Sequence, residues 1–149
     1  MKRFSEAYLN EVMETQGELF EDVKDYIPGI DVADFITKYM NSKTRALIDE
    51  GQAYLCTMEA KELFEYFVRT DSYQTKYGKD IGGFIPNWIG QFYACFQWVY
   101  NMSSGEVVKK VPLDFIIVGY RGLHDLDLLM SVKKVGRQLQ LLPAHEGRE

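Results

Sequence analysis

Apolar residues recur at helical spacing along most of this chain, and the first such stretch covers residues 4–26. Tyr8, Val12, Leu19 and Val23 fall in one row, four or seven residues apart, and acidic residues occupy the other side. This spacing predicts an amphipathic α-helix, because 3.6 residues complete one helical turn. Shorter stretches of the same kind follow between residues 31 and 68, separated by Gly and by residues that cap helices.

Residues 81–105 contain no charged side chain, although charged residues make up 26% of the whole chain. Within this stretch, residues 86–102 are apolar nearly all the way round a helix, which predicts a central helix buried in the core. A stripe of Asn87, Gln91, Trp98 and Asn101 interrupts the apolar surface. Because an unpaired buried amide costs roughly 1–3 kcal/mol, we expect this stripe to organise the core or to line an internal site.

The pattern beyond the central helix predicts three more helices. Ser103 and Glu106 have the spacing of a capping box, which begins a short helix. Residues 112–122 form the next, since proline is accepted at a helix start and glycine favours a helix end. We expect the last helix to run from about His124 to Leu142, with acidic residues in its first turn.

No stretch shows the alternation that is typical of a β-strand, and no composition shift marks a linker. Residues 1–149 are therefore predicted to form one all-α domain, a bundle of about seven to eight helices around residues 86–102. The tail, residues 143–149, is expected to fray. The longest irregular segment, residues 71–85, is either a binding loop or a solvated connector, and the sequence leaves its role open.

Composition narrows the classes of function. The 149 residues are 46% hydrophobic with a net charge of −5, which argues against broad binding to nucleic acid. Gly, Pro and amide residues interrupt the uncharged stretch, so we expect no membrane span and a cytoplasmic protein. Cys56 and Cys95 stand in apolar settings and are expected to be reduced.

Candidate chemistry is sparse. His124 followed by Asp125 suggests either a metal site or the start of a helix, and we favour the helix start, because further histidines with ligand spacing are lacking. No nucleophile–base set is recognisable, so we assign no catalytic residue, metal or cofactor. The candidate binding residues are the polar stripe with its neighbours and the expected helix start: Asn87, Trp88, Gln91, Trp98, Asn101, Tyr120, His124 and Asp125.

Several of these residues also carry a resemblance. The chain resembles small all-helical proteins of Firmicutes that share P-x-W-x-G and Q-W in a core helix, then V-P, then Y-x-x-x-H-[ED]. The corresponding positions here are Pro86, Trp88, Gly90, Gln97, Trp98, Val111, Pro112, Tyr120, His124 and Asp125. The genes of that group often lie beside genes of toxin-like proteins, including ADP-ribosyltransferase-like ones. The resemblance therefore implies a toxin–antitoxin or phage-defence setting and assigns no activity. Asp125, where the group favours Glu, and Phe96, where Tyr is common, depart from it.

Three hypotheses follow. The first is a non-catalytic, antitoxin-like module that binds another protein, with its negative charge matched to a basic toxin-like partner. The second is a small enzyme or ligand-binding protein with a pocket around Gln91, Trp98, Asn101 and His124. The third is a DNA-binding regulator that uses residues 106–120, although the helix in this segment has few side chains that read base edges. Whether the chain forms a homo-oligomer is left open.

Overall fold

The computed structural model describes residues 2–144, and these fold into nine α-helices with one isolated antiparallel bridge. The all-α prediction is confirmed, with slightly more helices than the sequence suggested. The helices are α1 Leu9–Tyr26, α2 Val32–Met40, α3 Lys43–Asp49, α4 Ala53–Cys56, α5 Ala60–Thr70, α6 Ile85–Tyr100, α7 Ser104–Lys110, α8 Leu113–Leu123 and α9 Leu128–Gln138.

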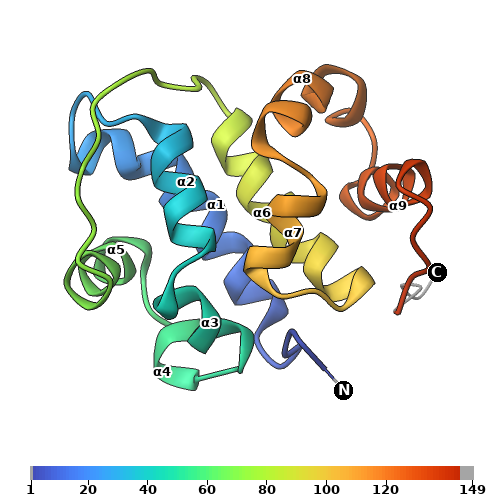
Figure 1. Ribbon diagram of the computed structural model, residues 1–149, viewed down its shortest axis with the longest axis horizontal. Helices are drawn as coiled ribbons and strands as arrows, with labels where there is room; N and C mark the ends of the chain where they lie inside the picture. The colour runs from blue at the N-terminus through green and yellow to red at the C-terminus, as the bar shows by residue number, and fades with distance from the viewer. Residues whose placement is uncertain (1, 145–149) are drawn as a thin grey trace.

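Helix α6 is the central helix, as predicted, and 13 of its 16 residues are buried. It runs between α1, α2 and α5 on one side and α7, α8 and α9 on the other (Figure 1). Pro86 lies in its first turn, where the missing N–H is not needed. Asn101 ends it with φ 53°, a left-handed conformation that Asn tolerates better than most residues.

Helices α1 and α6 approach each other very closely, because glycines face each other at the crossing. A Cβ atom on Gly90 would lie 2.6 Å from the carbonyl oxygen of Gln16, and one on Gly17 would lie 2.8 Å from the Asn87 side chain. Gly90 therefore cannot carry a larger side chain without moving the backbone of α1. This contact fixes the position of α1 against the core.

Aromatic side chains fill the space between α1, α2 and α5. Phe20 meets Tyr39 edge to face with ring centroids 5.8 Å apart, and Tyr39 meets Phe67 at 5.3 Å. Phe35 stacks on Tyr39 at 5.8 Å. Such geometries add about 0.5–1.5 kcal/mol per pair to the hydrophobic burial.

The irregular segment after α5 is tied to the turn before α2 by main-chain hydrogen bonds. Asp31 N donates to Lys76 O at 2.8 Å, and Gly78 N donates to Gly29 O at 3.1 Å. The segment runs as an extended strap from α5 along the upper left edge of the molecule to the start of α6 (Figure 1). These bonds anchor the segment to the turn before α2, and both alternatives for it, a binding loop and a solvated connector, stay predictions.

Two expectations about the C-terminal part are wrong. His124 does not start the last helix: it is the C-cap of α8, with its N–H donating to Tyr120 O at 2.8 Å, and α9 begins only at Leu128. The α8 helix continues past Gly122, because this glycine keeps a helical conformation. Much of α8 is exposed, since only Ile116 and Leu123 of this helix are buried.

The last predicted feature is the tail. Ala144 N donates to Val99 O at 2.7 Å, which holds the segment after α9 against α6. The remainder of the tail, residues 145–149, lies outside the described residues. No helix in residues 2–144 is both long and apolar enough to cross a membrane.

Candidate functional site

The polar stripe predicted on α6 is divided between two distant places. Asn87 and Gln91 lie against α1, where Asn87 Nδ2 donates to Glu21 Oε1 at 2.9 Å and Gln91 Nε2 donates to Asn87 Oδ1 at 2.6 Å. Asn101 lies at the other end of α6, where its Oδ1 accepts the N–H of Arg3 at 2.7 Å. The amides therefore fasten neighbouring segments to α6.

Trp88, Tyr120, His124 and Asp125 come together as one row at the contact between α6 and α8. The Trp88 ring meets Tyr120 edge to face at 5.4 Å, and Tyr120 stacks on His124 at 4.5 Å. The His124 Nε2 atom lies 3.2 Å from Asp125 Oδ1, and its Nδ1 lies 2.8 Å from Tyr120 O. Within residues 2–144, no three His, Cys, Asp or Glu side chains are grouped so that they could hold a metal ion.

These positions do not form the pocket of the enzyme hypothesis. Gln91 and Asn101 are ten residues apart on one helix, which places them about 15 Å apart along its axis. Gln91 contacts Asn87, Asn101 contacts Arg3, and His124 contacts Tyr120. Trp98, the fourth predicted member, is half-buried on α6. A role of the eight predicted residues in binding stays a prediction.

The sequence analysis missed a buried polar network centred on Arg45 of α3, whose side chain is 0% exposed. Its Nη1 donates to Asp49 Oδ1 at 2.6 Å, its Nε to Gln16 Oε1 at 2.7 Å and its Nη2 to Gln97 Oε1 at 2.6 Å. The Asp49 carboxylate also accepts Ser104 N at 2.8 Å, at the start of α7.

Each partner in this network uses its remaining atoms as well. Gln16 Nε2 donates to Gly90 O at 2.7 Å, and Gln97 Nε2 donates to Asp49 Oδ1 at 2.9 Å. The network thus joins α1, α3, α6 and α7, and each of these hydrogen bonds is made within the chain. The only signal in the sequence is the four-residue spacing of Arg45 and Asp49, which would also suit an exposed pair.

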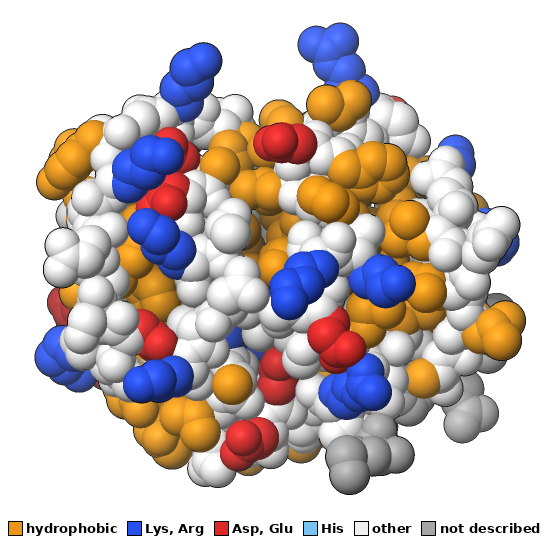
Figure 2. Space-filling model, viewed as in Figure 1, with side chains coloured by type: hydrophobic (Ala, Val, Ile, Leu, Met, Phe, Trp, Pro, Cys, Tyr) orange, Lys and Arg blue, Asp and Glu red, His pale blue; other side chains and the backbone are white. Residues whose placement is uncertain are grey.

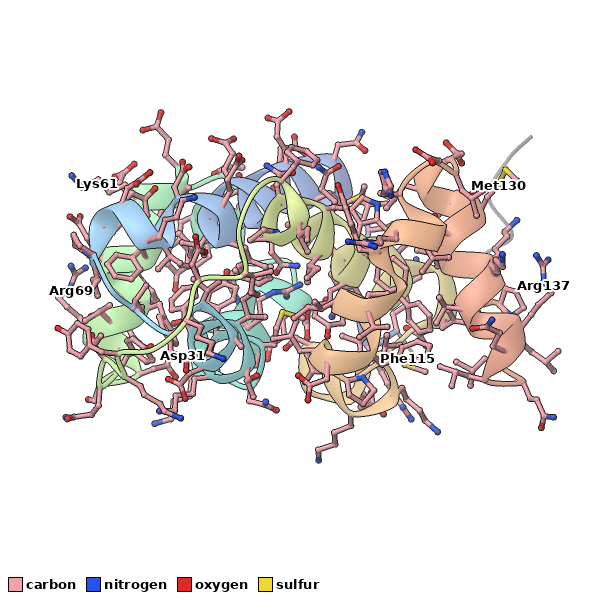
Figure 3. All side chains as sticks on the ribbon, turned by 90° about the horizontal axis from the view of Figure 1, so that it is seen from above. Asp31, Lys61, Arg69, Phe115, Met130 and Arg137 are labelled. Carbon is pink, nitrogen blue, oxygen red and sulfur yellow. The ribbon has the colours of Figure 1, made fainter. Side chains whose placement is uncertain are left out.

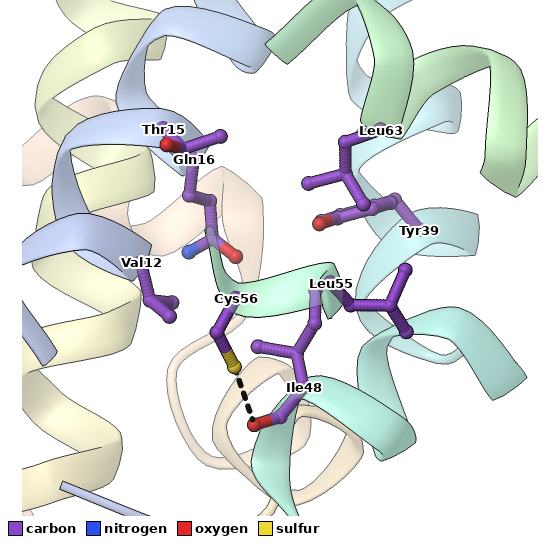
Figure 4. Close-up of a pocket in the computed structure, with 8 residues that line it drawn as sticks. All are labelled: Val12, Thr15, Gln16, Tyr39, Ile48, Leu55, Cys56 and Leu63. Atoms are coloured by element: carbon purple, nitrogen blue, oxygen red, sulfur yellow. Dashed lines mark hydrogen bonds between the residues drawn. The ribbon is translucent and has the colours of Figure 1, made fainter. Parts of the chain in front are cut away.

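A small enclosed cavity lies beside this network, between α1, α2, α3, α4 and α5 (Figure 4). Its volume is about 10 Å³, room for about one water molecule. Cys56 lines it and donates its Sγ hydrogen to Ile48 O at 3.6 Å. Burial raises the pKa of the Cys56 thiol, so the reactive thiolate is disfavoured there. The cavity is too small for an organic substrate.

An open groove of about 560 Å³ that is lined largely by acidic residues lies between α1 and the segment that begins α5. We call it the acidic groove. One wall comes from α1 and the other from residues 57–61. Its lining residues are Glu11, Glu14, Thr15, Glu18, Tyr26, Thr57, Met58, Glu59, Ala60 and Lys61. Lys61 marks this side of the molecule in Figure 3.

The four glutamates of the acidic groove are exposed, and none forms an ion pair within the described part of the chain. Glu59 precedes α5, yet its side chain makes no capping hydrogen bond. Tyr26 and Met58 are half-buried and supply apolar surface between the carboxylates. The groove therefore combines four carboxylates without an ion-pair partner among the described residues, one lysine, Lys61, and some apolar surface.

Two groups near the C-terminal end of α1, Tyr26 and Asp22, have raised pKa values, chiefly because they are partly buried. Burial raises the pKa of Tyr26, and the carboxylates of Asp22, Glu18 and Asp25 raise it further. Burial likewise raises the pKa of Asp22, with added repulsion from Glu21 and Asp25 that Lys24 only partly offsets. Both shifts have the direction that burial and neighbouring carboxylates produce, and of these carboxylates only Glu18 lines the acidic groove.

Neither the known protein-family models, nor the curated proteins, nor the solved structures include a match to this chain. The site is accordingly defined by its geometry and charge alone.

Proposed function

We propose that this protein is a non-catalytic binding module, and that the acidic groove between α1 and α5 receives a basic segment of a partner protein. The observation that carries the proposal is the set of four unpaired glutamates around the half-buried Tyr26 and Met58. Lys and Arg side chains suit such a groove, because their stems cover apolar surface and their charged heads reach carboxylates.

The arrangement of the glutamates is costly for the isolated chain. Glu14 and Glu18 are four residues apart on α1, and Glu11 and Glu14 are three apart, so like charges are neighbours on the helix surface. Such pairs destabilise a helix by about 0.2–0.5 kcal/mol each. A basic partner would offset this repulsion by its attraction to the same carboxylates, which supports a binding role for the three glutamates of α1.

In the antitoxin-like setting that the sequence resemblance implies, the partner is a basic toxin-like protein encoded beside this chain. We expect the two to meet in the cytoplasm, where buried thiols such as Cys56 and Cys95 stay reduced. Electrostatic complementarity would speed their association and select the partner.

The test is to co-express the chain with the products of its neighbouring genes and to measure binding of each purified partner by titration calorimetry. The triple variant Glu11→Gln, Glu14→Gln and Glu18→Gln should weaken binding at least tenfold, a loss of about 1.4 kcal/mol. A rise from low to physiological salt should also weaken it, because salt screens exposed charges.

The matched control is the double variant Glu62→Gln and Glu65→Gln, which removes exposed carboxylates of α5 that do not line the acidic groove. It should bind like the unmodified protein. An equal loss of affinity for the partner in both variants would show that binding depends on the net charge of the protein and not on the acidic groove. No complex with any neighbour, together with turnover of a small substrate, would overturn the proposal in favour of an enzyme.

A further inference from the structure

Helix α8 carries an exposed apolar stripe on the side of the molecule away from the acidic groove. Val118 is 80% exposed and Phe115 is 44% exposed, although both belong to one of the most apolar helices of the chain. Figure 2 shows apolar side chains gathered over the region of α8, and Figure 3 places Phe115 on the edge opposite Lys61. The α8 stripe consists of the exposed residues Asp114, Phe115, Val118, Arg121 and Gly122.

Gly122 has no role within its own chain that would require glycine. It is exposed and helical, its φ is not positive, and a Cβ atom built on it would meet nothing within 4 Å. A glycine inside a helix costs up to roughly 1 kcal/mol relative to alanine. Small residues on a helix face allow a second helix to approach closely.

The α8 stripe is self-complementary. Arg121 follows Asp114 by seven residues, and Gly122 follows Phe115 by the same interval, so each pair is separated by about two turns, roughly 10.5 Å along the axis. Both pairs are centred near Val118. A twofold axis near Val118 would therefore place each end of the stripe beside the opposite end of the same stripe on a second copy of the chain.

We propose that α8 pairs antiparallel with α8 of a second copy of this chain. Asp114 then faces Arg121 of the second copy, and Phe115 packs over the Gly122 of that copy. The two Val118 side chains meet at the axis. A parallel pairing is disfavoured, because it would set Asp114 against Asp114 and Arg121 against Arg121.

Charge complementarity identifies the occupant as a second copy. In the described residues, neither Asp114 nor Arg121 forms an ion pair, and at seven residues apart they do not reach each other. Half-buried Leu113, Ile117 and Tyr120 extend the apolar surface beside the stripe. A single helix pair covers less area than most permanent dimers bury, so the association should depend on protein concentration.

The test is sedimentation equilibrium of the purified chain over a range of concentrations. We expect a reversible dimer, and the single charge reversals Asp114→Arg and Arg121→Asp should each weaken it at least tenfold. The double variant Asp114→Arg with Arg121→Asp should restore it, because the two opposite charges have only changed places. The control Lys134→Asp, an exposed charge reversal on α9, should leave the dimer unchanged.

A monomer at all concentrations would overturn the proposal, as would a dimer that neither single reversal weakens or that the double variant fails to restore. Thermal unfolding of each variant at low concentration shows whether it is folded. The outcome is separate from that of the proposed function, because the triple glutamine variant of α1 should dimerise normally.

Discussion

At the scale of single residues, the least expected feature is the buried guanidinium of Arg45. Taking such a charge out of water is costly, and the network offsets the cost by pairing it with Asp49 and with the oxygens of Gln16 and Gln97. These groups come from three helices, α1, α3 and α6, and their hydrogen bonds hold the three helices together. Removing Arg45 leaves the Asp49 carboxylate buried without its cation.

Replacing Arg45 by Met should therefore destabilise the protein by about 3–5 kcal/mol, because the Asp49 carboxylate stays buried without its cation. Met keeps most of the stem volume, so the loss reports the charge and its hydrogen bonds. Urea unfolding measures the change. Lys43→Ala, at an exposed position of the same helix, should change stability by less than about 0.5 kcal/mol. A loss below about 1 kcal/mol for Arg45→Met would contradict this account of the network.

At the scale of elements, the close crossing of α1 and α6 depends on the absence of side chains at Gly17 and Gly90. In the sequence a second small residue, Ala94, follows Gly90 by four positions, a spacing that lets another helix approach closely. Which helix would approach it was not predictable, because several amphipathic helices have suitable faces. The structure assigns α1 to this place.

Gly90→Ala should destabilise the protein by about 1–3 kcal/mol, despite the better helix propensity of alanine, because the new methyl group would press on the backbone of Gln16. Gly122→Ala provides the opposite control. At low concentration it should be neutral or stabilising, since open space surrounds the new Cβ atom. Thermal unfolding of both variants shows whether Gly90→Ala lowers stability and Gly122→Ala does not. A more stable Gly90→Ala variant would show that α1 can move away from α6.

At the scale of the whole molecule, α6 is the most buried long helix, and the two surfaces that we propose for binding lie on outer helices. Phe92 and Phe96 are 0% exposed, whereas the acidic groove and the α8 stripe lie on opposite sides of this core. The protein can therefore present two separate surfaces, one charged and one apolar, on a single hydrophobic centre.

Phe92→Ala should cost about 3–5 kcal/mol, because it opens a cavity in the middle of the core. The matched control is Phe84→Ala, which removes the same atoms from a ring that is 52% exposed just before α6. It should cost less than half as much. Denaturant unfolding measures the free energy of unfolding of both variants. Similar losses of stability in the two variants would show that Phe92 is not at the centre of the core.

The sequence by itself determined the all-α class, the position of the central helix and the polar outer face of α1. Each follows from local spacing and from the absence of charge, which are properties of neighbouring residues in the chain. The capping box of Ser103 and Glu106 was also predicted and is present. The end of α8 was not predicted correctly, because Gly122 can either stop a helix or continue it. At the observed end, the Leu123 carbonyl accepts a hydrogen bond at 2.7 Å from Ser131 Oγ, which belongs to the next helix, α9.

Only the tertiary structure decided where polar groups are satisfied and which surfaces remain open. Arg45 is buried because Gln16, Gln97 and Asp49 converge on it from three helices, and a glutamate row becomes a groove only when residues 57–61 stand across from it. The α8 stripe stays exposed because the other helices cover only one side of an apolar helix. These outcomes depend on contacts between residues far apart in the chain, which local periodicity does not encode.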